Sequence, residues 1–112
     1  MGDPMTDSQE SIVVASRREG PKAIVELSGE LDLHSSPQLS ATVDDLLAES
    51  PSVVEIDAAG LTFADSAGLR ALLVAHADAG QQGVTLRLSR VSDQLDRLLE
   101  MTGLRETLVG AV

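Results

Sequence analysis

The feature that most constrains the fold of this chain is an alternation of strand-like and helix-like hydrophobic patterns. Two aliphatic runs, Ile12–Arg17 and Ala23–Leu27, flank the turn sequence Glu19–Lys22, whose Gly-Pro pair predicts a β-hairpin. Val53–Asp57 and Val84–Leu88 are two further strand-like runs, and each follows a stretch with apolar residues at helical spacing. The alternation therefore predicts βαβ units, whose strands lie parallel.

Three helices are predicted between and after these strands. Ser36, followed by a proline, is a suitable N-cap for the first helix, the second begins at Ser66, and Ser92 caps the third. Gly103 stands where a glycine commonly ends a helix, and residues 104–112 are expected to add one more helical turn. The apolar stripes of the three helices comprise Leu39, Val43, Leu46 and Leu47; Leu69, Leu72, Leu73 and His76; and Leu95, Leu98, Leu99 and Thr102.

These elements predict one domain of the α/β class. A length of 112 residues suits a single hydrophobic core. We expect a mixed sheet of four or five strands with helices packed on one face, in a domain that spans residues 12–112. Residues 1–11 are polar and acidic, and we expect a flexible N-terminal arm there rather than a signal peptide, with Met5 as an alternative start.

Charge and composition disfavour several classes of function. Eight basic and eighteen acidic residues give a formal net charge of −10, which opposes direct binding of nucleic acid or of an anionic membrane. Phe63 is the sole aromatic residue, so nucleic-acid bases would find few rings on which to stack. No apolar run approaches the roughly 20 residues of a membrane helix, and we expect a cytoplasmic protein. A basic partner would suit this charge, although solubility explains it more simply.

The sequence shows no catalytic or cofactor site. Without cysteine, a disulfide, a thiolate nucleophile and a Cys-ligated zinc site are excluded. His34 and His76 are the only histidines and lack partners at metal-ligand spacing, and His76 is better explained as a packed side chain. Glycine motifs for phosphate binding are missing, and Ser66 lacks the first glycine of a nucleophile elbow. We therefore predict no enzyme activity, no cofactor and no metal.

The most informative segment is Asp57–Leu73, with the sequence DAAGLTFADSAGLRALL. It predicts a strand, a loop of small residues, and a helix that begins at Asp65-Ser66. Either residue could simply cap that helix, which would contribute about 1 kcal/mol. The small residues also leave little cover around the Ser66 hydroxyl, and a helix N-terminus tolerates an added phosphate. Capping and modification both remain open from these residues alone.

Motifs along nearly the whole chain carry a resemblance to a known family. They are Gly29-Glu30-Leu31-Asp32, the strand ending in Asp57, Asp65-Ser66-Ala67-Gly68-Leu69, Gly83 before the next strand, and Leu99–Leu104 (LEMTGL). In this order they resemble the STAS domain of bacterial anti-sigma-factor antagonists and of the cytosolic tails of sulfate transporters. The family commonly has Asp-Ser-Ser-Gly-Leu around its serine. Ala67 replaces the second serine here, which leaves Ser66 as the matching phosphorylation site.

The resemblance implies a protein that switches partners. Unphosphorylated, it would bind an anti-sigma factor with serine kinase activity and so release a sigma factor for transcription. The kinase would then phosphorylate Ser66 and end the interaction, and a PP2C-type phosphatase would restore it. Carried over by position, Asp65-Ser66-Ala67-Gly68 would form the partner-binding surface, where Gly68 permits close approach. Asp32 and Thr62 would add further contacts.

Two alternatives remain open. Within the family, the chain could be a scaffold subunit of a lipid-transport or signalling assembly in which Ser66 is never modified. Outside the family, a stand-alone enzyme or nucleotide-binding domain is disfavoured by the missing motifs. A neighbouring kinase gene would favour the switch, and neighbouring permease genes would favour the scaffold.

Overall fold

A four-stranded mixed sheet forms the centre of the computed structural model, which describes residues 12–110. The predicted N-terminal arm, residues 1–11, lies outside the described residues. The strands are β1 (Ile12–Glu19), β2 (Lys22–Leu31), β3 (Val53–Ala64) and β4 (Thr85–Val91). β1 and β2 form the predicted antiparallel hairpin, and β2, β3 and β4 pair in parallel in the order of the sequence.

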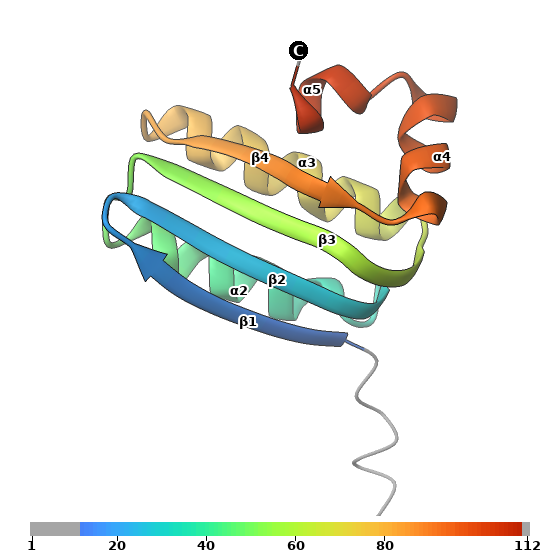
Figure 1. Ribbon diagram of the computed structural model, residues 1–112, viewed down its shortest axis with the longest axis horizontal. Coiled ribbons are helices and arrows are strands. Elements are labelled where there is room, and N and C mark those ends of the chain that lie inside the picture. Colours follow the sequence, from blue (N-terminus) through green and yellow to red (C-terminus); the bar gives the residue numbers. More distant parts are fainter. Residues whose placement is uncertain (1–11, 111–112) are drawn as a thin grey trace, which may run out of the picture.

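The helices make the connections that a parallel sheet requires. They are α2 (Ser36–Leu47), α3 (Ser66–Gln81), α4 (Asp93–Thr102) and α5 (Arg105–Val109). Figure 1 shows α2 and α3 side by side behind the sheet, with α4 and the short α5 beyond β4. The predicted α/β class, the mixed sheet and the helices on one face are confirmed, as is the extra helical turn after Gly103.

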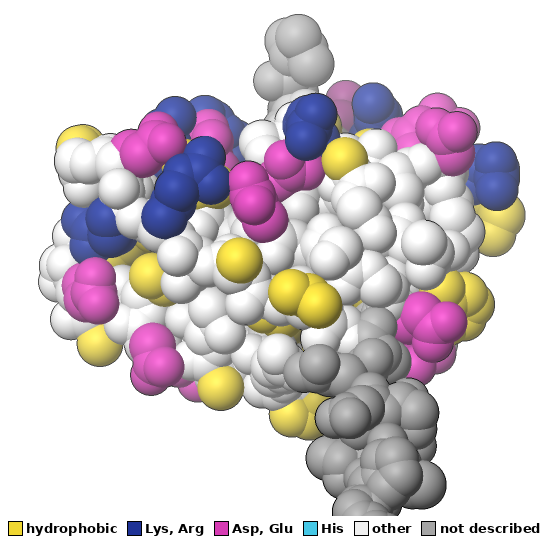
Figure 2. All heavy atoms as spheres, turned by 60° about the horizontal axis from the view of Figure 1, so that its bottom comes forward, with side chains coloured by type: hydrophobic (Ala, Val, Ile, Leu, Met, Phe, Trp, Pro, Cys, Tyr) yellow, Lys and Arg dark blue, Asp and Glu magenta, His cyan; other side chains and the backbone are white. Residues whose placement is uncertain are grey.

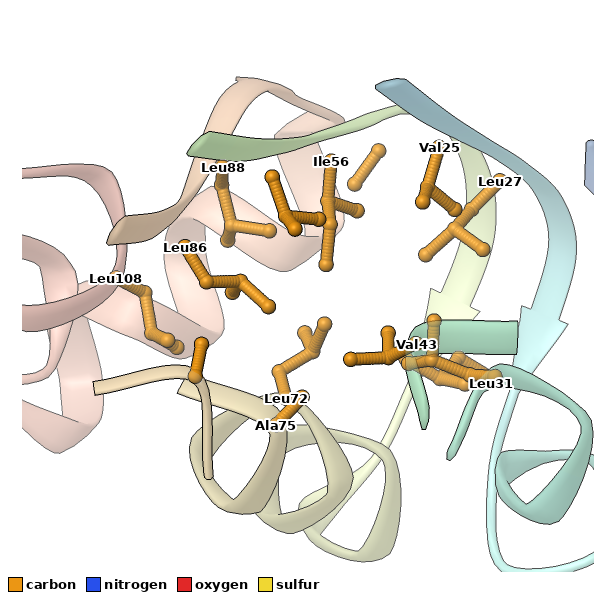
Figure 3. Close-up of a cluster of buried hydrophobic side chains, with 14 of the residues drawn as sticks. Val25, Leu27, Leu31, Val43, Ile56, Leu72, Ala75, Leu86, Leu88 and Leu108 are labelled. Atoms are coloured by element: carbon orange, nitrogen blue, oxygen red, sulfur yellow. The ribbon is translucent and has the colours of Figure 1, made fainter. Parts of the chain in front are cut away.

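The core lies between the sheet and these helices, and it is entirely aliphatic. Successive residues of a strand point to opposite faces, so alternate residues of β2, β3 and β4 enter the core. Figure 3 shows the inward-pointing residues of the strands above Leu72 of α3, with Leu108 of α5 entering from the side. The side chains from the strands in this view include Val25, Leu27, Ile56, Leu86 and Leu88, all buried.

The opposite face of the sheet is covered by ion pairs and not by a helix. Glu55 accepts a hydrogen bond from Arg87, and its Oε1 lies 3.5 Å from Lys22 Nζ. Asp57 Oδ2 lies 2.9 Å from Arg90 Nη2. Hydrogen bonds from Arg87 and Arg90 hold the pKa values of Glu55 and Asp57 below their usual range. Figure 2 shows basic and acidic side chains next to one another along the upper part of the view. This face is polar enough to stay in water without a covering layer.

Strands β2 and β3 are longer than the sequence predicts. β2 continues beyond Leu27, and β3 continues beyond Asp57 through the small residues interpreted above as a loop. Two β-bulges let the strands keep pairing until Leu31 meets Ala64. A Cβ on Gly60 would lie 2.9 Å from the carbonyl oxygen of Leu27. The small residues therefore serve strand pairing, where sequence reasoning assigned them to exposing a hydroxyl.

One of the predicted helix starts is shifted by a residue. Helix α2 begins at Ser36 with Ser35 at the N-cap position, so the prediction of Ser36 as the cap is wrong. The reason is that Ser35 and the carboxylate of Asp32 hydrogen-bond within the preceding loop and fix where the helix begins. The third helix agrees with its prediction, since Ser92 caps it and Gly103 ends it with φ 74°.

Candidate functional site

Ser66 lies where β3 passes into α3. Asp65 is the N-cap: its Oδ1 accepts a hydrogen bond of 2.9 Å from the N–H of Gly68, and its carbonyl accepts one of 2.9 Å from Leu69. Ser66 is the first residue of the helix and is exposed. Asp65 caps the helix, and the hydroxyl of Ser66 is accessible from solvent.

Gly68 has a packing role inside the domain. It is buried, and a Cβ at this position would lie 2.3 Å from the carbonyl oxygen of Leu31. That oxygen also accepts a hydrogen bond of 3.3 Å from the N–H of Asp65. The predicted close approach at Gly68 is therefore made by β2 of the same chain, and Gly68 is removed from the surface expected to meet a partner.

Asp32 organises the loop that follows β2. Its Oδ1 accepts hydrogen bonds of 3.0 Å from the N–H groups of His34 and Ser35. The hydrogen bond from the Ser35 N–H is the largest influence that holds the pKa of Asp32 below its usual range. Ser35 Oγ in turn accepts from the Asp32 N–H at 3.0 Å and donates to the Glu30 carbonyl at 2.8 Å. Asp32 thus stays ionised and gives the loop a defined shape.

The pairing of β2 with β3 brings most of the expected residues to one edge of the sheet. Leu31 pairs with Ala64, so Asp32 and Asp65, the residues that follow them, leave the sheet side by side. Thr62 is exposed on β3, and its hydroxyl donates to the Gly29 carbonyl on β2 at 3.2 Å. Ala67 follows Ser66 and is half-buried. The structure therefore groups Asp32, Thr62, Asp65, Ser66 and Ala67 at the carboxyl ends of β2 and β3.

Two apolar residues that sequence reasoning did not assign to the site lie at the same edge. Leu33, in the loop organised by Asp32, is 76% exposed, and Phe63, near the end of β3, is 42% exposed. Exposed apolar side chains beside polar ones are typical of surfaces that bind other proteins. Phe63, as the sole aromatic residue, is the signal that could have indicated this. We call Asp32, Leu33, Thr62, Phe63, Asp65, Ser66 and Ala67 the Ser66 edge.

His76 Nδ1 lies 2.9 Å from the Leu86 carbonyl oxygen, so it is the packed histidine that the sequence predicts. Between residues 12 and 110, no group of three or more histidine and acidic side chains could hold a metal ion. Within the same span, no helix is long and apolar enough to cross a membrane. The Ser66 edge can present a hydroxyl and an apolar contact surface to another protein.

Comparisons with known proteins agree with this fold. A family model described as "Mlab, STAS domain" matches residues 14–110. The anti-sigma-B factor antagonist of Bacillus subtilis is 31% identical over 84 residues, which cover 75% of this chain and 76% of the relative.

Two solved structures are similar over most of their length. An anti-sigma factor antagonist from Mycobacterium paratuberculosis superposes with a TM-score of 0.79 at 25% identity, covering 89% of this chain and 85% of the other. A sulfate transporter family protein from Wolinella succinogenes has a TM-score of 0.69 at 27% identity, covering 96% and 82%.

Proposed function

This chain belongs to the STAS domain family, and we propose on that basis that it is an anti-sigma factor antagonist. It would bind an anti-sigma factor and so release a sigma factor for transcription. The observation that carries the proposal is the exposed hydroxyl of Ser66 at the first residue of α3, next to the Asp65 cap and the exposed side chains of Leu33 and Phe63. The relatives that carry this role by name support it.

The partner in this proposal is an anti-sigma factor with serine kinase activity. Ser66 Oγ attacks the γ-phosphorus of ATP held by the kinase, ADP leaves, and a base of the kinase takes the hydroxyl proton. A PP2C-type phosphatase reverses the change by hydrolysis. The nucleotide belongs to the partner, and the antagonist acts by binding alone, in the cytoplasm where sigma factors meet RNA polymerase.

Electrostatics explain why phosphorylation would end the interaction. A phosphoryl group adds about −1.5 to −2 charges beside Asp65, on a chain whose formal net charge is already −10. In a complex, the partner would strip water from the phosphate, which is unfavourable unless the partner supplies cations. The contact that unphosphorylated Ser66 allows is therefore lost.

The free protein can hold the same phosphate without unfolding. The N-terminus of α3 favours negative charge because the helix dipole is positive at this end. Arg70 is exposed and stands four residues after Ser66, on the same side of α3, where its guanidinium can pair with the phosphate. Phosphorylation should therefore change the surface of the domain and leave its fold intact.

A second function is favoured by the description of the family model, which names Mlab. In that case the domain is a scaffold subunit of a lipid-transport or signalling assembly, and the Ser66 edge binds its partner permanently with Ser66 unmodified. The two functions differ in whether any kinase phosphorylates Ser66.

Incubation with the cognate anti-sigma factor and Mg-ATP, followed by intact mass and site mapping, tests the proposal. Wild type should gain one phosphate on Ser66, Ser66→Ala should gain none, and Ser16→Ala, which removes an exposed serine on β1, should react like wild type. The scaffold would be favoured if the partner binds wild type tightly but places no phosphate on Ser66. The control is that the same partner phosphorylates a second substrate.

A further inference from the structure

The backbone just before the switch serine is held by a side chain from α4. Gln94 Oε1 accepts a hydrogen bond of 2.8 Å from the N–H of Ala64, and Gln94 Nε2 donates one of 2.9 Å to the carbonyl of the same residue. One side-chain amide therefore satisfies both backbone polar groups of one residue, Ala64. This is the pairing that a neighbouring strand would otherwise supply.

A substitute is needed because β4 ends too early. β4 pairs with β3 only as far as Ala58, opposite Val91, and the chain then turns into α4. On its other side, β3 remains paired with β2 up to Ala64. Ala64 is buried, and buried backbone groups without a partner are strongly unfavourable. Gln94 fills that gap at the last residue of the strand.

Gln94 is itself held in place by the start of α4. The helix is capped by Ser92, whose Oγ accepts a hydrogen bond of 3.2 Å from the N–H of Leu95. Leu95 and Leu99 are fully buried in the core, so the helix cannot shift without disturbing the packing. The side chain of Gln94 therefore transmits the position of α4 to Ala64.

We propose that Gln94 is the positioning residue of the switch serine. Resting on the proposed function, the inference is that Ala64–Asp65 is fixed between two supports. The Leu31 carbonyl on β2 binds the Asp65 N–H, and Gln94 on α4 binds Ala64. Ser66 is the next residue, so the backbone that carries its hydroxyl is held in place. Phosphoryl transfer depends on such placement of the acceptor, because misplacement by about 1 Å can slow a reaction about a hundredfold.

The test compares the full chain with Gln94→Leu and Gln94→Ala. Leucine removes both hydrogen bonds and keeps the bulk of the side chain. Alanine also removes them but lets water reach the backbone of Ala64, so Gln94→Ala should fold even if Gln94→Leu is unstable. Thr102→Val is the matched control, since it deletes hydrogen bonds from a hydroxyl of α4 to the carbonyls of Leu98 and Leu99 in the same helix.

Amide hydrogen exchange and phosphorylation kinetics are the two measurements. After correction for any change in global stability, the Ala64 amide of Gln94→Leu should exchange about thirtyfold faster than that of wild type. This factor corresponds to about 2 kcal/mol for two lost hydrogen bonds. With the cognate kinase, both Gln94 variants should show a kcat at least about tenfold below wild type, with KM changed less, because the acceptor still binds but is poorly placed. Thr102→Val should match wild type in both.

The outcomes separate this inference from the proposed function. Unchanged exchange at Ala64 in both Gln94 variants would overturn the positioning role whatever the kinase does. Faster exchange at Ala64 with wild-type kcat would overturn it too, because the loosened loop would then be irrelevant to transfer. If wild type itself is neither bound nor phosphorylated, the proposed function fails, and the exchange experiment still decides whether Gln94 holds the loop.

Discussion

Substitution of Gly68 by alanine should destabilise the domain because it overpacks the contact between α3 and the end of β2. The added Cβ would meet the Leu31 carbonyl oxygen at 2.3 Å and the Leu31 Cγ at 2.9 Å. That carbonyl cannot move freely, because it also binds the Asp65 N–H. Overpacking of this kind destabilises by about 1–3 kcal/mol. At about 2 kcal/mol, the melting temperature of a domain of this size should fall by about 8–16 °C.

Gly80→Ala supplies the matched control. Gly80 lies in the same helix, but a Cβ there would meet nothing within 4 Å. Alanine has the better helix propensity, so this variant should be neutral or more stable than wild type by up to about 1 kcal/mol. Thermal melts by circular dichroism measure both. If Gly68→Ala melts as high as Gly80→Ala, the close packing of α3 on the end of β2 is refuted.

Three further predictions concern the core, the ion pairs and the N-terminus. Leu99→Ala should destabilise by about 2–5 kcal/mol and the half-buried Leu98→Ala by less, and equal urea midpoints would contradict the burial of this helix. The pKa of Asp57 is lower in the folded protein than its ordinary value of 3.8, so its pairing with Arg90 stabilises the fold at pH above 3.8, and this stabilisation is lost as the pH falls through the folded-state pKa. In urea unfolding measured from pH 6 to 3, the free energy of unfolding of Asp57→Asn should therefore fall less steeply with decreasing pH than that of wild type. Deletion of Met1–Glu10 should leave the melting temperature and partner affinity near wild type, and a large loss of either would show that this segment docks.

Hydrophobic periodicity in the sequence was sufficient to predict the strands and helices and their order along the chain. Alternate residues in Val84–Leu88 and the helical stripe through Leu95 and Leu99 report directly which face is buried, so strands, helices and class follow. The ends of β2 and β3 do not follow from a local pattern. Gly60 and its small neighbours are typical of a loop, and only the pairing of two strands past a bulge explains them.

The site, like the fold, has features that the local sequence predicts and features that depend on long-range contacts. Asp65-Ser66 at a helix start is a local signal, and the structure has it there. The role of Gly68 depends on Leu31, and the hold on Ala64 depends on Gln94 thirty residues away, so neither contact is visible in the sequence around Ser66. Residues that act through long-range contacts need the fold before they can be recognised.

Calorimetric titration against the cognate anti-sigma factor tests the central claim most directly. The samples are unphosphorylated wild type, Ser66→Ala, and wild type phosphorylated on Ser66, each checked for an unchanged melting temperature. Wild type and Ser66→Ala should bind with similar affinity. The phosphorylated protein should bind at least about a hundredfold more weakly, since the partner would strip water from the added phosphate and supply no cations to it. Equal affinity of all three samples would contradict the switch at Ser66.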